Sequence, residues 1–141
     1  MKLISACLLG VNCRYDGTNR LQDEERLHAV EETLIPVCPE QLGGLGTPRA
    51  PMQIIGGRGA DVVDGTARVV NADGEDVTAH LLKGADEVMK IAAFLGIREA
   101  IMKRDSPSCG SDEKLEGVTT ALLRRKGIQV FTEEALQTHF T

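Results

Sequence analysis

Four cysteines are the residues of this chain with the most chemistry to offer, and they stand at Cys7, Cys13, Cys38 and Cys109. A cysteine can fill an apolar core, form half of a disulfide, or present a thiolate as a nucleophile or metal ligand. With 141 residues, the chain can bury a core without disulfides. The apolar stretch after Met1-Lys2 is too short for a signal peptide, so we expect a cytoplasmic protein. In that reducing setting, cysteines are more often free, metal-bound or catalytic than paired.

The spacing of the cysteines separates the candidate chemistries. A structural zinc usually takes four closed ligands in CxxC pairs, and a thioredoxin-like centre also uses CxxC, a motif that this sequence lacks. A cysteine–histidine hydrolase is disfavoured because the three histidines fall on expected helices, at His28, His80 and His139. An iron–sulfur cluster needs thiolates but no local spacing. Three ligands to such a cluster would leave one iron open to a substrate.

The loops around the cysteines are rich in residues that fix backbone geometry. The segment CPEQLGGLGTPR (38–49) holds two prolines and three glycines around Glu40, Gln41 and Arg49, and DSPSCGSDE (105–113) holds the fourth cysteine. GVNCRYDG (10–17) adds Cys13 to the set. Prolines and glycines either make a plain turn or set the backbone for close approach and for aiming amide groups at a ligand.

The elements that must position these loops alternate between short apolar runs and helical patterns, which is typical of βα units in a parallel sheet. The runs 2–6, 33–38, 98–103 and 128–131 predict strands, and Pro36 places the second of them near an edge or shortens it. Helices are predicted at 22–32 (with Leu21, Leu27 and Val30 toward the sheet), 76–95, 118–126 and 133–140. We expect one α/β domain over residues 1–141, a small Rossmann-like open parallel sheet of about four strands with flanking helices.

One segment departs from the βα pattern. Residues 60–70 read ADVVDGTARVV, in which β-branched residues flank Asp64-Gly65. This is a hairpin signal. We therefore predict an appended β-hairpin here, either a surface flap or a lid over the site.

In an open parallel sheet, ligands collect outside the carboxyl ends of the strands. Cys7 follows the first predicted strand, Cys38 closes the second and Cys109 lies just beyond the third. The topology thus places three distant cysteines at one rim of the sheet. Buried cysteine is also a common core residue, which is the plainer explanation for any one of them.

Charge and hydropathy limit the partners. The net charge is −5, and no basic block is present, so we expect no nucleic-acid partner. No apolar run approaches the roughly 18 residues that a membrane span needs. A small molecule is the expected partner, and the oligomeric state is left open.

Four motifs in this order, SACLLGVNCRYDG, PVCPEQLGGLGTPR, SPSCG and GVTTALLRRKGI, closely resemble a bacterial family that includes the thiouracil desulfidases. The resemblance covers almost the whole chain. It implies an enzyme in which three cysteines hold a 4Fe–4S cluster with one iron free for the substrate sulfur. It further implies a non-redox desulfuration of a thiolated pyrimidine such as 2-thiouracil, in which oxygen from water replaces sulfur.

Carried onto this sequence, the resemblance makes Cys7, Cys38 and Cys109 the cluster ligands. It matches Glu40 to the acid after the second cysteine, which could transfer a proton. Ser106 and Ser108 match the serines before the third cysteine, which could orient water or the pyrimidine edge. Cys13 is a fourth displaceable ligand, a redox-sensitive thiol or, as we favour, a buried spectator that lies nearby but points elsewhere.

Two departures from the family pattern lie beside the expected pocket. Arg104 and Asp105 stand where relatives usually carry a small residue and arginine, and the segment 110–116 is short. These leave the exact substrate open. Two alternatives to an enzyme also stay open: a module that binds metal or sulfide without turnover, and a structural zinc protein.

Overall fold

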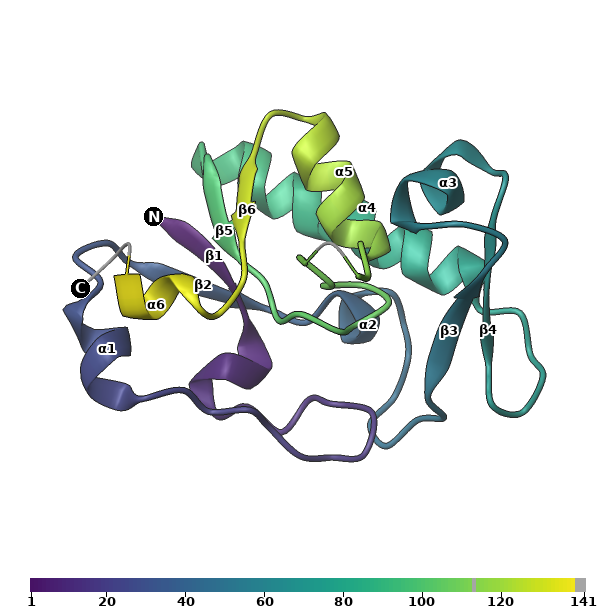
Figure 1. Ribbon diagram of the computed structural model, residues 1–141, viewed down its shortest axis with the longest axis horizontal. Helices are drawn as coiled ribbons and strands as arrows, with labels where there is room; N and C mark the ends of the chain where they lie inside the picture. The colour runs from purple at the N-terminus through teal and green to yellow at the C-terminus, as the bar shows by residue number, and fades with distance from the viewer. Residues whose placement is uncertain (113, 139–141) are drawn as a thin grey trace.

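Four parallel strands form the main sheet in this computed structural model, which describes residues 1–112 and 114–138. They are β1 (Lys2–Ser5), β2 (Leu34–Val37), β5 (Glu99–Ile101) and β6 (Gln129–Phe131), in the order β2-β1-β5-β6 (Figure 1). The predicted Rossmann-like parallel sheet is confirmed. β2 is an edge strand and its Pro36 is exposed, which is where a strand tolerates a missing N–H donor.

The central strand β1 is covered on both faces, as its continuous apolar run predicts. Leu3 and Ile4 are both fully buried but belong to different core clusters. Leu3 packs in the cluster that contains residues of α4 (Thr78–Leu95) and α5 (Val118–Arg125). Ile4 packs in the cluster that contains residues of α1 (Glu24–Ala29) and α6 (Ala135–Thr138), on the opposite side in Figure 1.

The predicted helices 76–95 and 118–126 are confirmed as α4 and α5. α1 is shorter than the predicted 22–32, because Asp23 caps it by accepting hydrogen bonds from the amides of Glu25 and Arg26. Leu27 is buried as expected, whereas Leu21 is 47% exposed and does not face the sheet. The end of the predicted helix 133–140, including His139, lies outside the described residues.

The appended antiparallel pair of strands is confirmed, but its placement within residues 60–70 was wrong. An antiparallel pair does exist, but it joins β3 (Met52–Ile55) to β4 (Arg68–Asn71), while Gly59–Asp64 forms the helix α3 between them. Asp61 accepts a hydrogen bond from the Arg58 amide and so starts α3. Gly65, at φ 83°, ends that helix in the left-handed conformation instead of turning a hairpin.

Two short helices follow β1 and β2, the strands that precede Cys7 and Cys38. The 3₁₀ helix η1 (Ala6–Leu9) follows β1, and α2 (Pro39–Leu42) follows β2. α2 packs closely on α4. The absence of a side chain at Gly84 permits this, since a Cβ there would lie 2.0 Å from the carbonyl oxygen of Pro39. His80 Nδ1 lies 2.8 Å from the carbonyl oxygen of Gly43, just after α2. These contacts fix the loop that holds Cys38 and Glu40.

Among the described helices, none is both long and apolar enough to cross a membrane.

Candidate functional site

The structure brings three strand-end cysteines into one cavity. Cys7 lies in η1 just after β1, Cys38 follows β2 directly, and Cys109 lies in the loop after β5. All three line a single cavity at the carboxyl edge of the parallel sheet. Their common position follows from the parallel strand order, because the carboxyl ends of β2, β1 and β5 lie side by side.

Cys13 lines the same cavity. Its side chain is 3% exposed, and its thiol interacts with the thiols of Cys7 and Cys38. The Cys38 thiol also donates a 3.7 Å hydrogen bond to the carbonyl oxygen of Cys13. The expectation that Cys13 lies nearby is confirmed, and the expectation that its thiol points elsewhere is wrong.

The pKa values of the Cys13, Cys38 and Cys109 thiols are raised, which favours their neutral forms. Burial raises the pKa of Cys109 to about 12, although hydrogen bonds from Ser5 and Ser108 act in the opposite direction. The hydrogen bond with Cys13, together with burial, raises the pKa of the Cys38 thiol far above its usual range. Thiols of this kind ionise when a metal binds, because coordination removes the proton.

The donor set fits an iron–sulfur cluster. All four cysteines are free thiols, and thiolate is the ligand that such clusters use. Across residues 1–112 and 114–138, no three cysteine, histidine or acidic side chains stand where they could hold a single metal ion. A cluster of several irons spreads its ligands around a larger body, so cysteines on three separate loops suit it.

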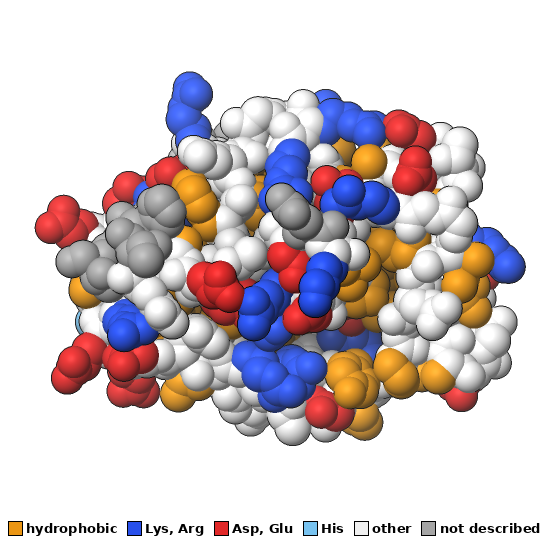
Figure 2. Space-filling model, in the orientation of Figure 1, with side chains coloured by type: hydrophobic (Ala, Val, Ile, Leu, Met, Phe, Trp, Pro, Cys, Tyr) orange, Lys and Arg blue, Asp and Glu red, His pale blue; other side chains and the backbone are white. Residues whose placement is uncertain are grey.

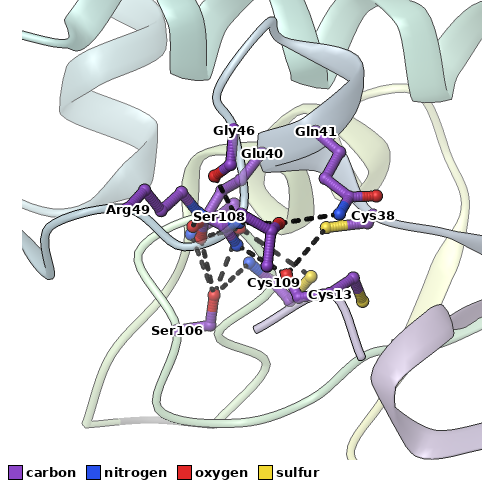
Figure 3. Close-up of polar contacts among 10 residues, drawn as sticks. Cys13, Cys38, Glu40, Gln41, Gly46, Arg49, Ser106, Ser108 and Cys109 are labelled. Carbon is purple, nitrogen blue, oxygen red and sulfur yellow. Dashed lines mark hydrogen bonds and ion pairs between the residues drawn. The ribbon is translucent and has the colours of Figure 1, made fainter. Parts of the chain in front are cut away.

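Glu40 is a buried acid beside the cysteines, at 7% exposure. Its Oε2 accepts a 2.7 Å hydrogen bond from the Ser108 hydroxyl, and its Oε1 lies 2.8 Å from Nε of Arg49 (Figure 3). Both oxygens therefore bond to side chains outside α2. The plainer role that a carboxylate has at this position, capping the first turn of α2, does not account for these bonds.

Ser106 and Ser108 differ in their surroundings. Ser108 is 1% exposed and bonds directly to Glu40. The Ser106 hydroxyl oxygen accepts hydrogen bonds from the amides of Ser108 and Cys109, at 3.3 and 3.2 Å. Its own proton faces the Ser108 hydroxyl at 3.1 Å and Glu40 Oε2 at 3.5 Å. Ser106 thus bonds mainly to the backbone of its own loop, while Ser108 makes the closer bond to the acid.

The loop of Cys109 rests on the start of α5. The amides of Val118 and Thr119 donate to the carbonyl oxygens of Pro107 and Ser108, at 2.8 and 2.9 Å. Gly117 permits this approach, because a Cβ there would lie 2.4 Å from the Ser108 carbonyl. The first turn of α5 therefore holds the loop of Cys109 in place.

Two residues of the site, Ser5 and Arg49, were not predicted from the sequence. Ser5, the last residue of β1, accepts a 2.8 Å hydrogen bond from the Lys103 amide, and its hydroxyl interacts with the Cys109 thiol. Its place at the carboxyl end of a strand was a signal that could have found it. Arg49 was noticed only as a member of its loop, and nothing in the sequence pairs it with Glu40.

The basic residues that line the cavity are paired with acids. Arg49 pairs with Glu40, and the other pairs are Arg14–Asp16, Lys103–Glu133 and Arg104–Glu134. Figure 2 shows basic and acidic side chains next to one another near the centre of this face. The rim of the cavity is therefore largely charge-compensated.

A parallel sheet covered on both faces, with a cavity of four cysteine thiols at its carboxyl edge, defines a Rossmann-like α/β domain with a cysteine-lined site. Residues 3–135 match the family model described as 2-thiouracil desulfurase. The chain belongs to this family.

Similar proteins agree with the match. The uncharacterized protein YbbK of Bacillus subtilis (strain 168) is 42% identical, in a comparison that covers 96% of this chain and 97% of YbbK. A solved structure of the [4Fe-4S]-dependent thiouracil desulfidase TudS (DUF523Vcz) is 40% identical, with a TM-score of 0.78. That comparison covers 96% of this chain and 92% of TudS.

Proposed function

We propose that this protein is a desulfidase that removes sulfur from a thiolated pyrimidine such as 2-thiouracil. The observation that carries the proposal is the convergence of Cys7, Cys38 and Cys109 on one cavity, beside the buried pair Glu40–Ser108. The family match and the likeness to TudS support it. Cys7, Cys38 and Cys109 would hold a 4Fe–4S cluster.

When bound, such a cluster supplies a Lewis acid and a soft partner for sulfur. The proposal uses three ligands, and these are the thiols that follow the ends of β1, β2 and β5. Cys13 lies further along the chain, after η1, and is not among them. The protein's own residues then have to hold the substrate and move a proton.

Glu40 is the group proposed to move that proton. Its carboxylate takes a proton from the water that replaces the sulfur, or returns one to the product. Ser108 holds Oε2 of this carboxylate through the 2.7 Å hydrogen bond. Ser106 keeps the loop in shape through the amides of Ser108 and Cys109.

An uncharged heterocycle suits the cavity better than an anionic substrate. Each basic residue that lines the cavity already pairs with an acid, so a phosphate or carboxylate would meet little uncompensated positive charge. Apolar residues share the lining, among them Val37, Pro51 and Met52.

The setting is part of the same proposal. Residues 1–141 act as one domain, because α3, β3 and β4 share an apolar cluster with α4 and α5. We place the protein in the cytoplasm, with a small-molecule partner and without nucleic acid or membrane.

The deciding experiment measures iron and sulfide release on the same samples. Parent protein and Glu40→Gln are reconstituted anaerobically with iron and sulfide and then given 2-thiouracil. Both should hold the cluster, and Glu40→Gln should release sulfide about 10²–10⁴-fold more slowly. A loaded parent that releases no sulfide would make the protein a binding module, and tight zinc without iron would make it a structural zinc protein.

A further inference from the structure

Arg49 is a buried charged residue to which the proposed reaction assigns no role. Its side chain is 9% exposed, and each nitrogen of the guanidinium donates within the protein (Figure 3). Nε bonds to Glu40 Oε1 at 2.8 Å, and Nη2 bonds to the Cys13 carbonyl at 2.9 Å. Nη1 bonds to the Gly46 carbonyl and the Thr47 hydroxyl, at 3.1 and 2.9 Å.

These bonds fix the direction of the Glu40 carboxylate. The guanidinium is planar and rigid, and its own position is set by Gly46 and Thr47, which lie in the same loop. With Oε1 held by Arg49, Oε2 faces Ser108. Without Arg49, the buried carboxylate would lose its only ionic partner among the described residues.

Arg49 also joins two loops at the cavity. Its amide donates to the Tyr15 carbonyl at 2.8 Å, and its Nη2 shares the Cys13 carbonyl with the Cys38 thiol. If Cys38 ionises as a ligand, its thiol no longer donates to that carbonyl, and the Arg49 bond then remains. The segment around Cys13 is thus held against the loop of Glu40 by one side chain.

We propose that Arg49 is a positioning residue that acts through Glu40. It holds the carboxylate so that Oε2 meets Ser108 beside the cysteines, and it makes no bond to a ligand cysteine side chain. This inference rests on the proposed function in one respect, the proton transfer assigned to Glu40.

A double-mutant cycle on the reconstituted protein tests it. The proteins are the parent, Glu40→Gln, Arg49→Gln, the double variant, Arg49→Lys, and Arg125→Gln as a matched control whose partner Asp64 lies outside the cavity. Arg49→Gln should keep its iron and lose tenfold or more in kcat, with KM within about twofold. The double variant should be no slower than Glu40→Gln alone, and Arg49→Lys should regain part of the rate.

Three results would overturn the inference. They are an activity of Arg49→Gln equal to that of Arg125→Gln, a double variant whose loss of rate is the product of the two single losses, and loss of iron from Arg49→Gln.

A second readout, thermal unfolding, does not depend on turnover. In thermal unfolding, Arg49→Gln should melt below the double variant, because Arg49→Gln leaves the buried Glu40 carboxylate without its ionic partner, whereas the double variant removes both charges. If the double variant melts lower instead, Arg49 does not act through Glu40. An inactive, fully loaded parent would refute the desulfidase proposal, and the melting comparison would still decide this one.

Discussion

Ser108 and Glu40 are separated by 68 positions in the sequence, and the serine hydroxyl donates a 2.7 Å hydrogen bond to the carboxylate. The bond joins the loop after β5 to the loop after β2, on either side of the central strand β1. Since Cys109 and Cys38 lie next to these residues in the two loops, the acid and the thiols are positioned by the same backbone.

The two serines should respond differently to removal of the hydroxyl. Ser108→Ala deprives Oε2 of its close donor, so we expect sulfide release to fall roughly 10–100-fold with iron content unchanged. Ser106→Ala loses two amide contacts instead, and should lower stability by about 1 kcal/mol with the smaller loss of rate. Rates and melting temperatures of both variants check this. Equal rate losses would contradict the division of roles.

The four cysteines should separate into three ligands and one neighbour. Cys7→Ala, Cys38→Ala and Cys109→Ala each remove a proposed ligand, so each should lose the visible absorbance of the cluster and its sulfide release. Cys13→Ala is the matched control, because it removes a buried thiol from the same cavity. It should retain iron. Iron analysis after anaerobic reconstitution decides, and loss of iron from Cys13→Ala would add Cys13 to the ligands.

The contact between α2 and α4 should be intolerant of a methyl group. Gly84→Ala would place a Cβ 2.0 Å from the Pro39 carbonyl, so α2 must move. We expect a loss of about 1–3 kcal/mol in stability, and impaired loading at Cys38. Gly46→Ala is the control, since its Cβ would meet no heavy atom within 4 Å. Urea unfolding and iron content of the two variants measure the difference.

The protein without its cluster should lose stability in alkali. Burial raises the pKa of Cys109 from 9.0 to about 12, so the folded thiol keeps its proton while the unfolded thiol ionises. The unfolded state therefore binds fewer protons above pH 9.0, and stability falls as the pH rises toward about 12. Unfolding of the reduced protein across this range should show the slope, and Cys109→Ala should make it less steep, while the raised pKa values of Cys13 and Cys38 maintain the remainder. An unchanged slope in that variant would count against the assignment.

The sheet was predictable because its strands carry their own signal. Leu3 and Ile4 lie in a continuous apolar run, and both are buried because the sheet is covered on two faces. The convergence of the cysteines followed from the same pattern, since the end of a parallel strand fixes what lies beyond it. The position of the three cysteines depends on the topology of the sheet, and the periodicity of the sequence predicts that topology.

The features that were predicted wrongly or missed depend on contacts between distant segments. Asp64-Gly65 has the same local preference at the end of a helix as in a hairpin turn, and the strand β3 that pairs with β4 decides between them. The pairing of Arg49 with Glu40 depends on how the loop after α2 folds back on itself. The path of an irregular loop leaves no periodic pattern in the sequence. For this reason, neither the Arg49–Glu40 pair nor the direction of the Cys13 thiol could be predicted.

The order of the strands bears on when the site can be assembled. β1 is the first strand of the chain, yet Leu3 pairs with Ala100, and the loop of Cys109 rests on the first turn of α5. As the chain leaves the ribosome, Cys7 and Cys38 emerge long before α5 is available to support the loop of Cys109. Iron and sulfide delivered early would meet thiols without their partner. Insertion of a cluster at the proposed ligands is therefore tied to a nearly complete polypeptide, and these thiols have to stay reduced throughout that interval.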